Sequence, residues 1–116
     1  MKFICYPKCT TCKRAEDYLK GQEISFTKRD IKEENFAELE AWYKASGLPL
    51  KRFFNTSGLK YKELLLKDKL PHMTENEQLK LLATDGMLVK RPILVSDKFV
   101  LVGFKEKEWG EKLDHR

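Results

Sequence analysis

The feature that most constrains the fold is a Cys-Thr-Thr-Cys sequence, residues 9–12, at the junction of two segments with different periodicity. Residues 2–6 are apolar and β-prone, and Pro7 ends them, which predicts a short strand. From Thr10 onward apolar residues recur at helical spacing until Gly21, which predicts a helix. The two cysteines therefore occupy the turn that leads from a strand into the start of a helix.

A second strand is predicted directly after this helix. Residues 23–29 alternate between polar and apolar side chains, which puts Ile24, Phe26 and the stem of Lys28 on one side. A strand, a helix and a strand at this spacing form a β-α-β unit, in which the two strands run parallel and are joined by a right-handed crossover.

The middle of the chain, over about residues 34–86, is predicted to be helical. One helix ends at residues 46–47, Ser-Gly, and a shorter one is expected around the three leucines 64–66. Residues 74–77, Thr-Glu-Asn-Glu, have the sequence of a capping box at the start of a further helix. The apolar face of the first of these helices consists of Phe36, Leu39, Trp42 and Tyr43.

The C-terminal part is predicted to contain two more strands and a helix. Residues 93–95 and 99–102 are β-prone and are separated by a polar turn. A final helix from about Lys105 would bury Trp109 and Leu113. The order β-α-β, helical block, β-β-α, with a cysteine pair after the first strand, predicts an α/β protein of thioredoxin-like (glutaredoxin-like) fold with an inserted helical subdomain.

The length and the charge of the chain limit the classes of function. Its 116 residues suit a single domain. It has no apolar run of the roughly 20 residues that a membrane span needs, and its first residues predict no signal peptide. Its net charge is +5, but its basic residues are interleaved with acidic ones, as in Lys-Glu-Lys-Glu at 105–108. This pattern argues against a nucleic-acid surface. We therefore expect a cytoplasmic monomer without direct contacts to nucleic acid or membrane.

The position of Cys9 predicts a reactive thiolate. The first turn of a helix has unpaired N–H groups and a positive dipole end, so the pKa of Cys9 should fall below the ordinary value of about 8.5. Lys8 and Lys13 act in the same direction. Cys12 is within reach to attack an adduct on Cys9 and release it as an intramolecular disulfide.

Other uses of the cysteines have less support. Three cysteines, an odd number, argue against a disulfide framework. A zinc site would need a second pair of ligands, and neither Cys5 nor His72 and His115 have the spacing of one, so no metal or bound cofactor is expected. Cys5 lies in the predicted first strand and is expected to be a small core residue.

The same turn is also predicted to bind an anion. Thr10 and Thr11 offer N–H and hydroxyl donors at a helix N-terminus, where oxyanions bind readily. Arg91 precedes Pro92 at the start of the third strand, where a proline loses no hydrogen bond of the sheet. By analogy with thioredoxin-like folds, the bond between Arg91 and Pro92 is expected to be cis and to direct Arg91 toward Cys9.

Residues 55–58, Asn-Thr-Ser-Gly, form a predicted turn with surplus hydrogen-bonding groups. Gly58 is expected to adopt a positive φ, and Asn55 is expected to hydrogen-bond its own backbone. Two interpretations of this turn are open: a substrate-binding role for Asn55, and a turn with a structural role alone.

Three segments carry a resemblance that extends over essentially the whole chain in the same order. They are residues 6–13, Tyr-Pro-Lys-Cys-Thr-Thr-Cys-Lys, residues 53–58, Phe-Phe-Asn-Thr-Ser-Gly, and residues 90–95, Lys-Arg-Pro-Ile-Leu-Val, followed by Leu-Val-Gly-Phe at 101–104. Together they resemble the arsenate reductase (ArsC)/Spx family. The resemblance is nearest to the arsenate reductase-related branch that carries Phe-Phe-Asn-Thr-Ser-Gly, and it implies a thioredoxin-like fold.

The enzymes of this family form a thiol–arsenate adduct at the cysteine that matches Cys9 and reduce it to arsenite with glutathione and glutaredoxin. The resemblance thus implies a thiol-dependent oxidoreductase, with glutaredoxin or thioredoxin as reductant and partner. Of the three arginines in the family's anion pocket, one matches Arg91. Asn55 and Phe104 stand near the other two positions, and Lys13 is the basic residue after the cysteine loop. Two bidentate guanidinium groups are thereby absent.

The Spx-type members of the family are regulators. They use cysteines that match Cys9 and Cys12 as a disulfide switch and bind the C-terminal domain of the RNA polymerase α-subunit. Gly47 stands at about the position of their interface glycine, although they do not carry Phe-Phe-Asn-Thr-Ser-Gly. The sequence therefore leaves three functions open: an oxyanion reductase, a redox-switched regulator and a general disulfide reductase.

Overall fold

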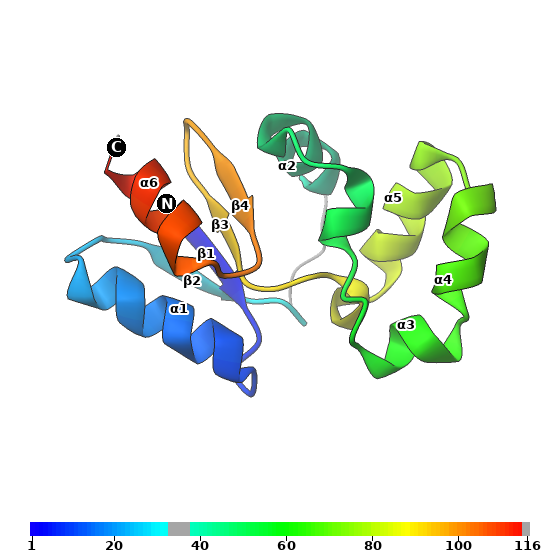
Figure 1. Cartoon of the computed structure of the whole chain (residues 1–116), viewed down its shortest axis with the longest axis horizontal. Coiled ribbons are helices and arrows are strands. Elements are labelled where there is room, and N and C mark those ends of the chain that lie inside the picture. The colour runs from blue at the N-terminus through cyan, green and yellow to red at the C-terminus, as the bar shows by residue number, and fades with distance from the viewer. Residues whose placement is uncertain (33–37, 115–116) are drawn as a thin grey trace.

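The computed structural model describes residues 1–32 and 38–114 of the chain. Its centre is a four-stranded sheet in the order β2-β1-β3-β4 (Figure 1). The strands are β1 (Lys2–Cys5), β2 (Thr27–Asp30), β3 (Ile93–Val95) and β4 (Val100–Val102). β1 pairs with β2 in parallel and with β3 in antiparallel orientation, and β3 pairs with β4 in antiparallel orientation. The parallel β-α-β opening and the C-terminal pair of strands that the sequence predicts are confirmed.

Helices α1 (Thr10–Gly21) and α6 (Glu106–Leu113) pack on the same side of the sheet (Figure 1). Trp109 is fully buried, and its Nε1 donates to the carbonyl oxygen of Gly103 at 3.0 Å. Leu113 is 1 % exposed, so the predicted burial of both α6 residues is confirmed. The strand residues that complete this core are Phe3, Cys5, Leu94 and Leu101.

The other side of the sheet packs against the helical block, which comprises α2 (Leu39–Ser46), α3 (Leu59–Glu63), α4 (Leu66–Lys69) and α5 (Glu75–Thr84). Ile4 belongs to this second core together with Trp42, because successive side chains of a strand point to opposite faces. These four helices lie within the range predicted to be helical, and Gly47 ends α2 at a φ of 69°. Phe36, predicted to be part of the apolar face of α2, lies outside the described residues.

The second strand begins later than its sequence predicts. Residues 23–26 precede β2, which starts at Thr27. Glu23 has a φ of 56°, and the N–H groups of Glu23 and Ile24 donate to carbonyls in the last turn of α1 at 3.0 and 3.1 Å. These residues close the C-terminus of the helix, so their N–H groups are not available to the sheet. Ile24 is nevertheless buried, so the alternating sequence pattern at this position reflects burial and not a strand.

The leucines at residues 64–66 do not form the single helix that their sequence predicts. α3 ends at Glu63 and α4 begins at Leu66, with Leu65 in the left-handed region at a φ of 55°. Consecutive helical residues point in directions about 100° apart, so three in a row cannot all face one core. The break leaves Leu65 60 % exposed and turns Leu66 inward, where it is 2 % exposed.

The helices are short, and the start of α5 is set by a local signal. The Thr74 hydroxyl accepts a hydrogen bond from the N–H of Glu77 at 3.2 Å, and the Glu77 carboxylate accepts one from the N–H of Thr74 at 2.8 Å. The predicted capping box is thereby confirmed. No helix within residues 1–32 and 38–114 is both long and apolar enough to cross a membrane.

Candidate active site

Three segments that are distant in the sequence meet at one end of the sheet. β1 stops at Cys5 and leads into residues 6–9, β3 begins after Arg91 and Pro92, and β4 leads into Gly103. The N–H of Gly103 donates to the carbonyl oxygen of Pro92 at 2.8 Å. Because β1 and β3 are antiparallel, the end of the first strand lies beside the start of the other. The bond between Arg91 and Pro92 is cis, as the analogy with thioredoxin-like folds predicts.

Cys9 is the N-terminal cap of α1. Its Sγ accepts a hydrogen bond from the backbone N–H of Cys12 at 3.4 Å, in the place that a serine or aspartate oxygen takes in most caps. Partial burial acts to raise the pKa of Cys9, but it is outweighed by hydrogen bonds from Cys12 and Thr11 and by the positive charge of Arg91. The pKa of Cys9 is therefore lowered, and Cys9 ionises more readily than an ordinary cysteine.

Cys12 is the protonated member of the pair. It is 3 % exposed, and burial raises the pKa of its thiol to about 12, although the N–H of Tyr6 donates to its Sγ at 3.4 Å. A hydrogen bond between the two side chains lowers the pKa of Cys9 and raises that of Cys12. The sulfur that ionises more readily thus lies in contact with a protonated thiol, an arrangement suited to an attack by Cys12 on an adduct of Cys9.

Arg91 brings positive charge to this end of the sheet. Its guanidinium carbon lies 5.1 Å from the centroid of the Tyr6 ring, and its Nη1 lies 3.5 Å from the carbonyl oxygens of Met87 and Val89. Both contacts with carbonyls use Nη1, whereas a guanidinium has five N–H donors. The Arg91 side chain therefore has donors for a ligand, and its charge acts on Cys9.

The other loop residues predicted to bind an anion lie around Cys9. The N–H of Thr11 forms a hydrogen bond that lowers the pKa of Cys9. Thr10 is the first residue of α1 and is exposed. Lys13 is exposed too, and its Nζ pairs with Oδ1 of Asp17 at 3.2 Å. The binding of an anion by this turn stays a prediction.

Asn55 lies in the turn that leads into α3. Its N–H donates to the carbonyl oxygen of Leu88 at 2.7 Å, next to a β-bridge between Phe54 and Val89. The predicted positive φ at Gly58 is wrong, because its φ is −77°. A Cβ at Gly58 would lie 2.7 Å from Nδ2 and 3.2 Å from the carbonyl oxygen of Asn55, so a larger residue there would displace the Asn55 amide. The Asn55 amide folds over its own turn, and its substrate-binding role stays a prediction.

Phe104, near the position of a family arginine, is part of an aromatic cluster. Its ring centroid lies 5.0 Å from that of Trp109. The guanidinium carbon of Arg14, on α1, lies 5.7 Å from the centroid of Phe104, so α1 supplies a cation beside this ring. Sequence reasoning missed Arg14, and it missed Tyr6 as the partner of Arg91. Each stacking partner is remote in the sequence, so no local pattern could have shown these contacts.

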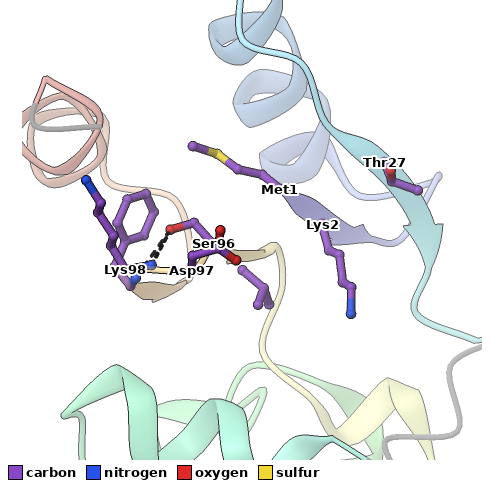
Figure 2. Close-up of a pocket in the computed structure, with 8 residues that line it drawn as sticks. Met1, Lys2, Thr27, Ser96, Asp97 and Lys98 are labelled. Atoms are coloured by element: carbon purple, nitrogen blue, oxygen red, sulfur yellow. Dashed lines mark hydrogen bonds between the residues drawn. The ribbon is translucent and has the colours of Figure 1, made fainter.

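A crevice of about 250 Å³ lies beside the cysteine pair. Its lining includes the two buried cysteines Cys5 and Cys12, and charged residues from α1 and β2, namely Lys13, Glu16, Lys20 and Lys28. A larger hollow, of about 470 Å³, lies at the other end of the sheet, where Figure 2 shows Lys2, Ser96 and Lys98 around it. Among residues 1–32 and 38–114, no three His, Cys, Asp or Glu side chains are grouped to hold a metal ion.

Comparison with known proteins gives consistent matches. The ArsC family model matches residues 5–112. YusI of Bacillus subtilis is 51% identical over 113 residues, 96% of each chain. The regulatory protein MgsR of Bacillus subtilis is 32% identical, covering 93% of this chain and 86% of its own length. The global transcriptional regulator Spx of Enterococcus faecalis is 31% identical, covering 88% and 77%. A crystal structure of an ArsC family related protein from Bacteroides fragilis matches with a TM-score of 0.91 at 54% identity, covering 95% of this chain and 94% of its own. This match confirms the predicted thioredoxin-like α/β fold.

Proposed function

Because the chain belongs to the ArsC family, we propose that it is a thiol-dependent oxidoreductase that reduces a small oxidised or oxyanionic substrate. The observation that carries the proposal is the pairing at the start of α1. Cys9 has a lowered pKa and caps the helix, and the protonated thiol of Cys12 lies beside it. Such a pair suits a reaction in which one sulfur forms an adduct and the other displaces it.

The reaction proceeds in two steps. The Cys9 thiolate attacks the oxidised centre of the substrate, a sulfur–substrate bond forms, and an oxygen of the substrate takes up protons from the solvent and leaves as water. Cys12 then attacks the Cys9 sulfur and loses its proton, a disulfide forms, and the electron pair of the sulfur–substrate bond leaves with the product. The two thiols lose two electrons and the substrate gains two, so an external thiol must reduce the disulfide before the next turnover.

The substrate is bound in this proposal by the positive end of α1 and by Arg91. The N–H groups of Thr10 and Thr11 and the ammonium group of Lys13 add donors, and Asn55 is the donor that this proposal takes from the helical block. A hydrogen bond to a charged group contributes about 1.5–3 kcal/mol, so a pocket with one arginine should bind arsenate less tightly than a pocket with three.

We place the reaction in the cytoplasm, with glutathione and glutaredoxin or with thioredoxin as the reductant. The thiol pool of that compartment keeps cysteines reduced between turnovers. Redox partners of this kind act by attack of a thiolate on the disulfide, and the partly exposed Cys9 is the sulfur that such a partner can reach.

The first test is arsenate-dependent oxidation of NADPH, run separately with the glutathione/glutaredoxin and the thioredoxin systems. Cys9→Ser serves as the blank, because it lacks the thiolate at the start of α1. Turnover that Cys9→Ser abolishes would support the proposal and identify the reductant. No turnover with either system would exclude arsenate as the substrate, and arsenate-dependent turnover that persists in Cys9→Ser would exclude Cys9 as the nucleophile.

A second candidate function is a redox-switched regulator, which the identity with MgsR and Spx favours. In this case the Cys9–Cys12 disulfide would alter binding to the C-terminal domain of the RNA polymerase α-subunit. The test is a pull-down of that domain with the oxidised and the reduced protein, and with Arg91→Glu. Binding that responds to neither change would rule out this switch.

A further inference from the structure

Cys5 is a third thiol beside the redox pair, and the reaction proposed above does not use it. It is the last residue of β1, and the pleat of the strand directs its side chain, like that of Phe3, toward the core that α1 completes. Cys12 belongs to the same core from the helix side. Cys5 is 2 % exposed, which confirms its predicted place in the core.

The sulfur of Cys12 lies close to the end of β1. The N–H group that donates to Cys12 Sγ at 3.4 Å is that of Tyr6, the residue bonded directly to Cys5. Cys5 and Cys12 line the same crevice. Charge on Cys5 raises the pKa of Cys12, and charge on Cys9 raises that of Cys5. The three thiols therefore form one group at the junction of β1 and α1.

We propose that Cys5 is a third redox-active cysteine, and that a Cys9–Cys12 disulfide exchanges to a Cys5–Cys12 disulfide inside the crevice. The exchange rests on the proposed function for the formation of the first disulfide. It restores the Cys9 thiol while the chain is still oxidised, and it moves the oxidised pair from the start of α1 into the crevice.

The exchange needs no added oxidant or reductant. The Cys5 thiolate attacks Cys12 Sγ, a bond between these two sulfurs forms, and the bond between Cys9 and Cys12 breaks. The electron pair of the broken bond leaves on Cys9, and the proton of Cys5 passes to water in the crevice. Thiols of lower pKa leave faster, and the N-terminus of α1 makes Cys9 the better leaving group.

Charged groups from two elements face Cys5. Burial raises the pKa of Cys5, the positive charge of Lys28 lowers it, and the carboxylates of Glu16 and Asp30 raise it. Lys28 Nζ lies 3.1 Å from Oε1 of Glu16, and Lys20 Nζ lies 3.4 Å from the other oxygen of that carboxylate. Lys28 is therefore the cation that favours a Cys5 thiolate, and Lys28→Gln should slow the exchange.

Trypsin distinguishes the two disulfides directly. Cleavage after Lys8 places Cys5 in the fragment 3–8 and the other two cysteines in the fragment 9–13. The protein is oxidised with diamide, quenched in acid, alkylated with iodoacetamide, digested and analysed by mass spectrometry. We expect wild-type protein to yield the two fragments joined by a disulfide, with the alkyl group on Cys9.

Two single variants provide the matched controls. Cys9→Ser should still yield the joined fragments, whereas Cys5→Ala should yield only the disulfide within fragment 9–13 and should lose alkylation at Cys9. If Cys9→Ser is folded by circular dichroism and yields no joined fragments, while Cys5→Ala forms its internal disulfide, the exchange is overturned and the proposed function stands. If Cys5→Ala forms no internal disulfide, the proposed function fails and the exchange fails with it.

A third variant keeps all three thiols and tests the crevice. Lys28→Gln should slow the conversion of the internal disulfide to the joined form several-fold. The conversion is measured on samples quenched in acid at successive times. The alkylation rate of Cys9 in the reduced protein is the control and should not change. Conversion at the wild-type rate would overturn the assignment of the exchange to this crevice.

Discussion

The two ends of the four-stranded sheet are both hollowed and both lined by lysines, yet they differ in chemistry. Where β1 stops, a crevice of about 250 Å³ is lined by Cys5 and Cys12 together with Lys28. At the opposite end, a hollow of about 470 Å³ is lined by Lys2 and Lys98 but by no cysteine (Figure 2). The larger hollow is therefore the one without a nucleophilic thiol, and size alone does not locate the site.

The direction of the chain explains the difference. Where β1 leads into α1 a helix begins, and the N–H groups of its first turn point at Cys9. At the other end the chain turns directly from β3 to β4, and the Ser96 hydroxyl accepts hydrogen bonds from the N–H groups of Lys98 and Phe99 at 3.0 and 3.3 Å. These two donors are used within the turn itself. The start of a helix, rather than a basic hollow, distinguishes the reactive end.

The largest effect should come from Cys9→Ser, at the reactive end. A serine hydroxyl neither ionises at neutral pH nor forms a disulfide, so substrate-dependent NADPH oxidation should fall to the rate without enzyme. Cys12→Ser separates the two steps, because it should retain one adduct per chain on Cys9 without turnover. Full turnover by Cys9→Ser would show that the end of the sheet with Cys9 is not the reactive one.

A smaller effect should come from Arg91→Ala. Loss of its hydrogen bonds to an anionic substrate should lower kcat/KM by about 10- to 100-fold, since such bonds contribute about 1.5–3 kcal/mol. Arg91→Lys keeps the charge without the bidentate geometry, so its kcat/KM should lie between that of the wild type and that of Arg91→Ala. Steady-state kinetics checks this order. Wild-type kinetics in Arg91→Ala would show that the start of α1 binds the substrate without it.

The pH dependence of Cys9 sharpens the comparison without a substrate. Because its pKa is lowered, the rate of alkylation by iodoacetamide should rise with pH and reach half its maximum below the ordinary value of about 8.5. Arg91→Gln removes a charge that lowers this pKa, so the midpoint should move to higher pH. A wild-type midpoint at the ordinary value would contradict the role assigned to the helix N-terminus.

The smallest effect should come from Lys98→Ala, at the end without thiols. Lys98 is exposed, and a surface substitution of this kind usually changes stability by less than about 0.5 kcal/mol. Its melting temperature and its kcat/KM should therefore match those of the wild type. A loss of activity as large as that of Arg91→Ala would show that the hollow in Figure 2 takes part in the reaction.

Most elements of the fold could be predicted because local signals agree with tertiary packing. The capping box at Thr74 and the spacing of Trp109 and Leu113 each match the structure. The errors in element boundaries lie near Glu23 and Leu65, where residues other than glycine adopt left-handed backbone. Propensity disfavours that conformation, so it arises only where packing of the neighbouring segments compensates for it.

The sequence by itself determined which chemical groups are available and how those within one helical turn are spaced, as in Cys9 and Cys12. Only the tertiary structure decided which remote groups meet them. The register of the sheet brings Arg91 to the Tyr6 ring, and the packing of α1 on β1 brings Cys12 to the crevice that Cys5 lines. Covalent spacing sets distances along a turn, whereas contacts between segments depend on strand register and core packing, which local periodicity does not encode.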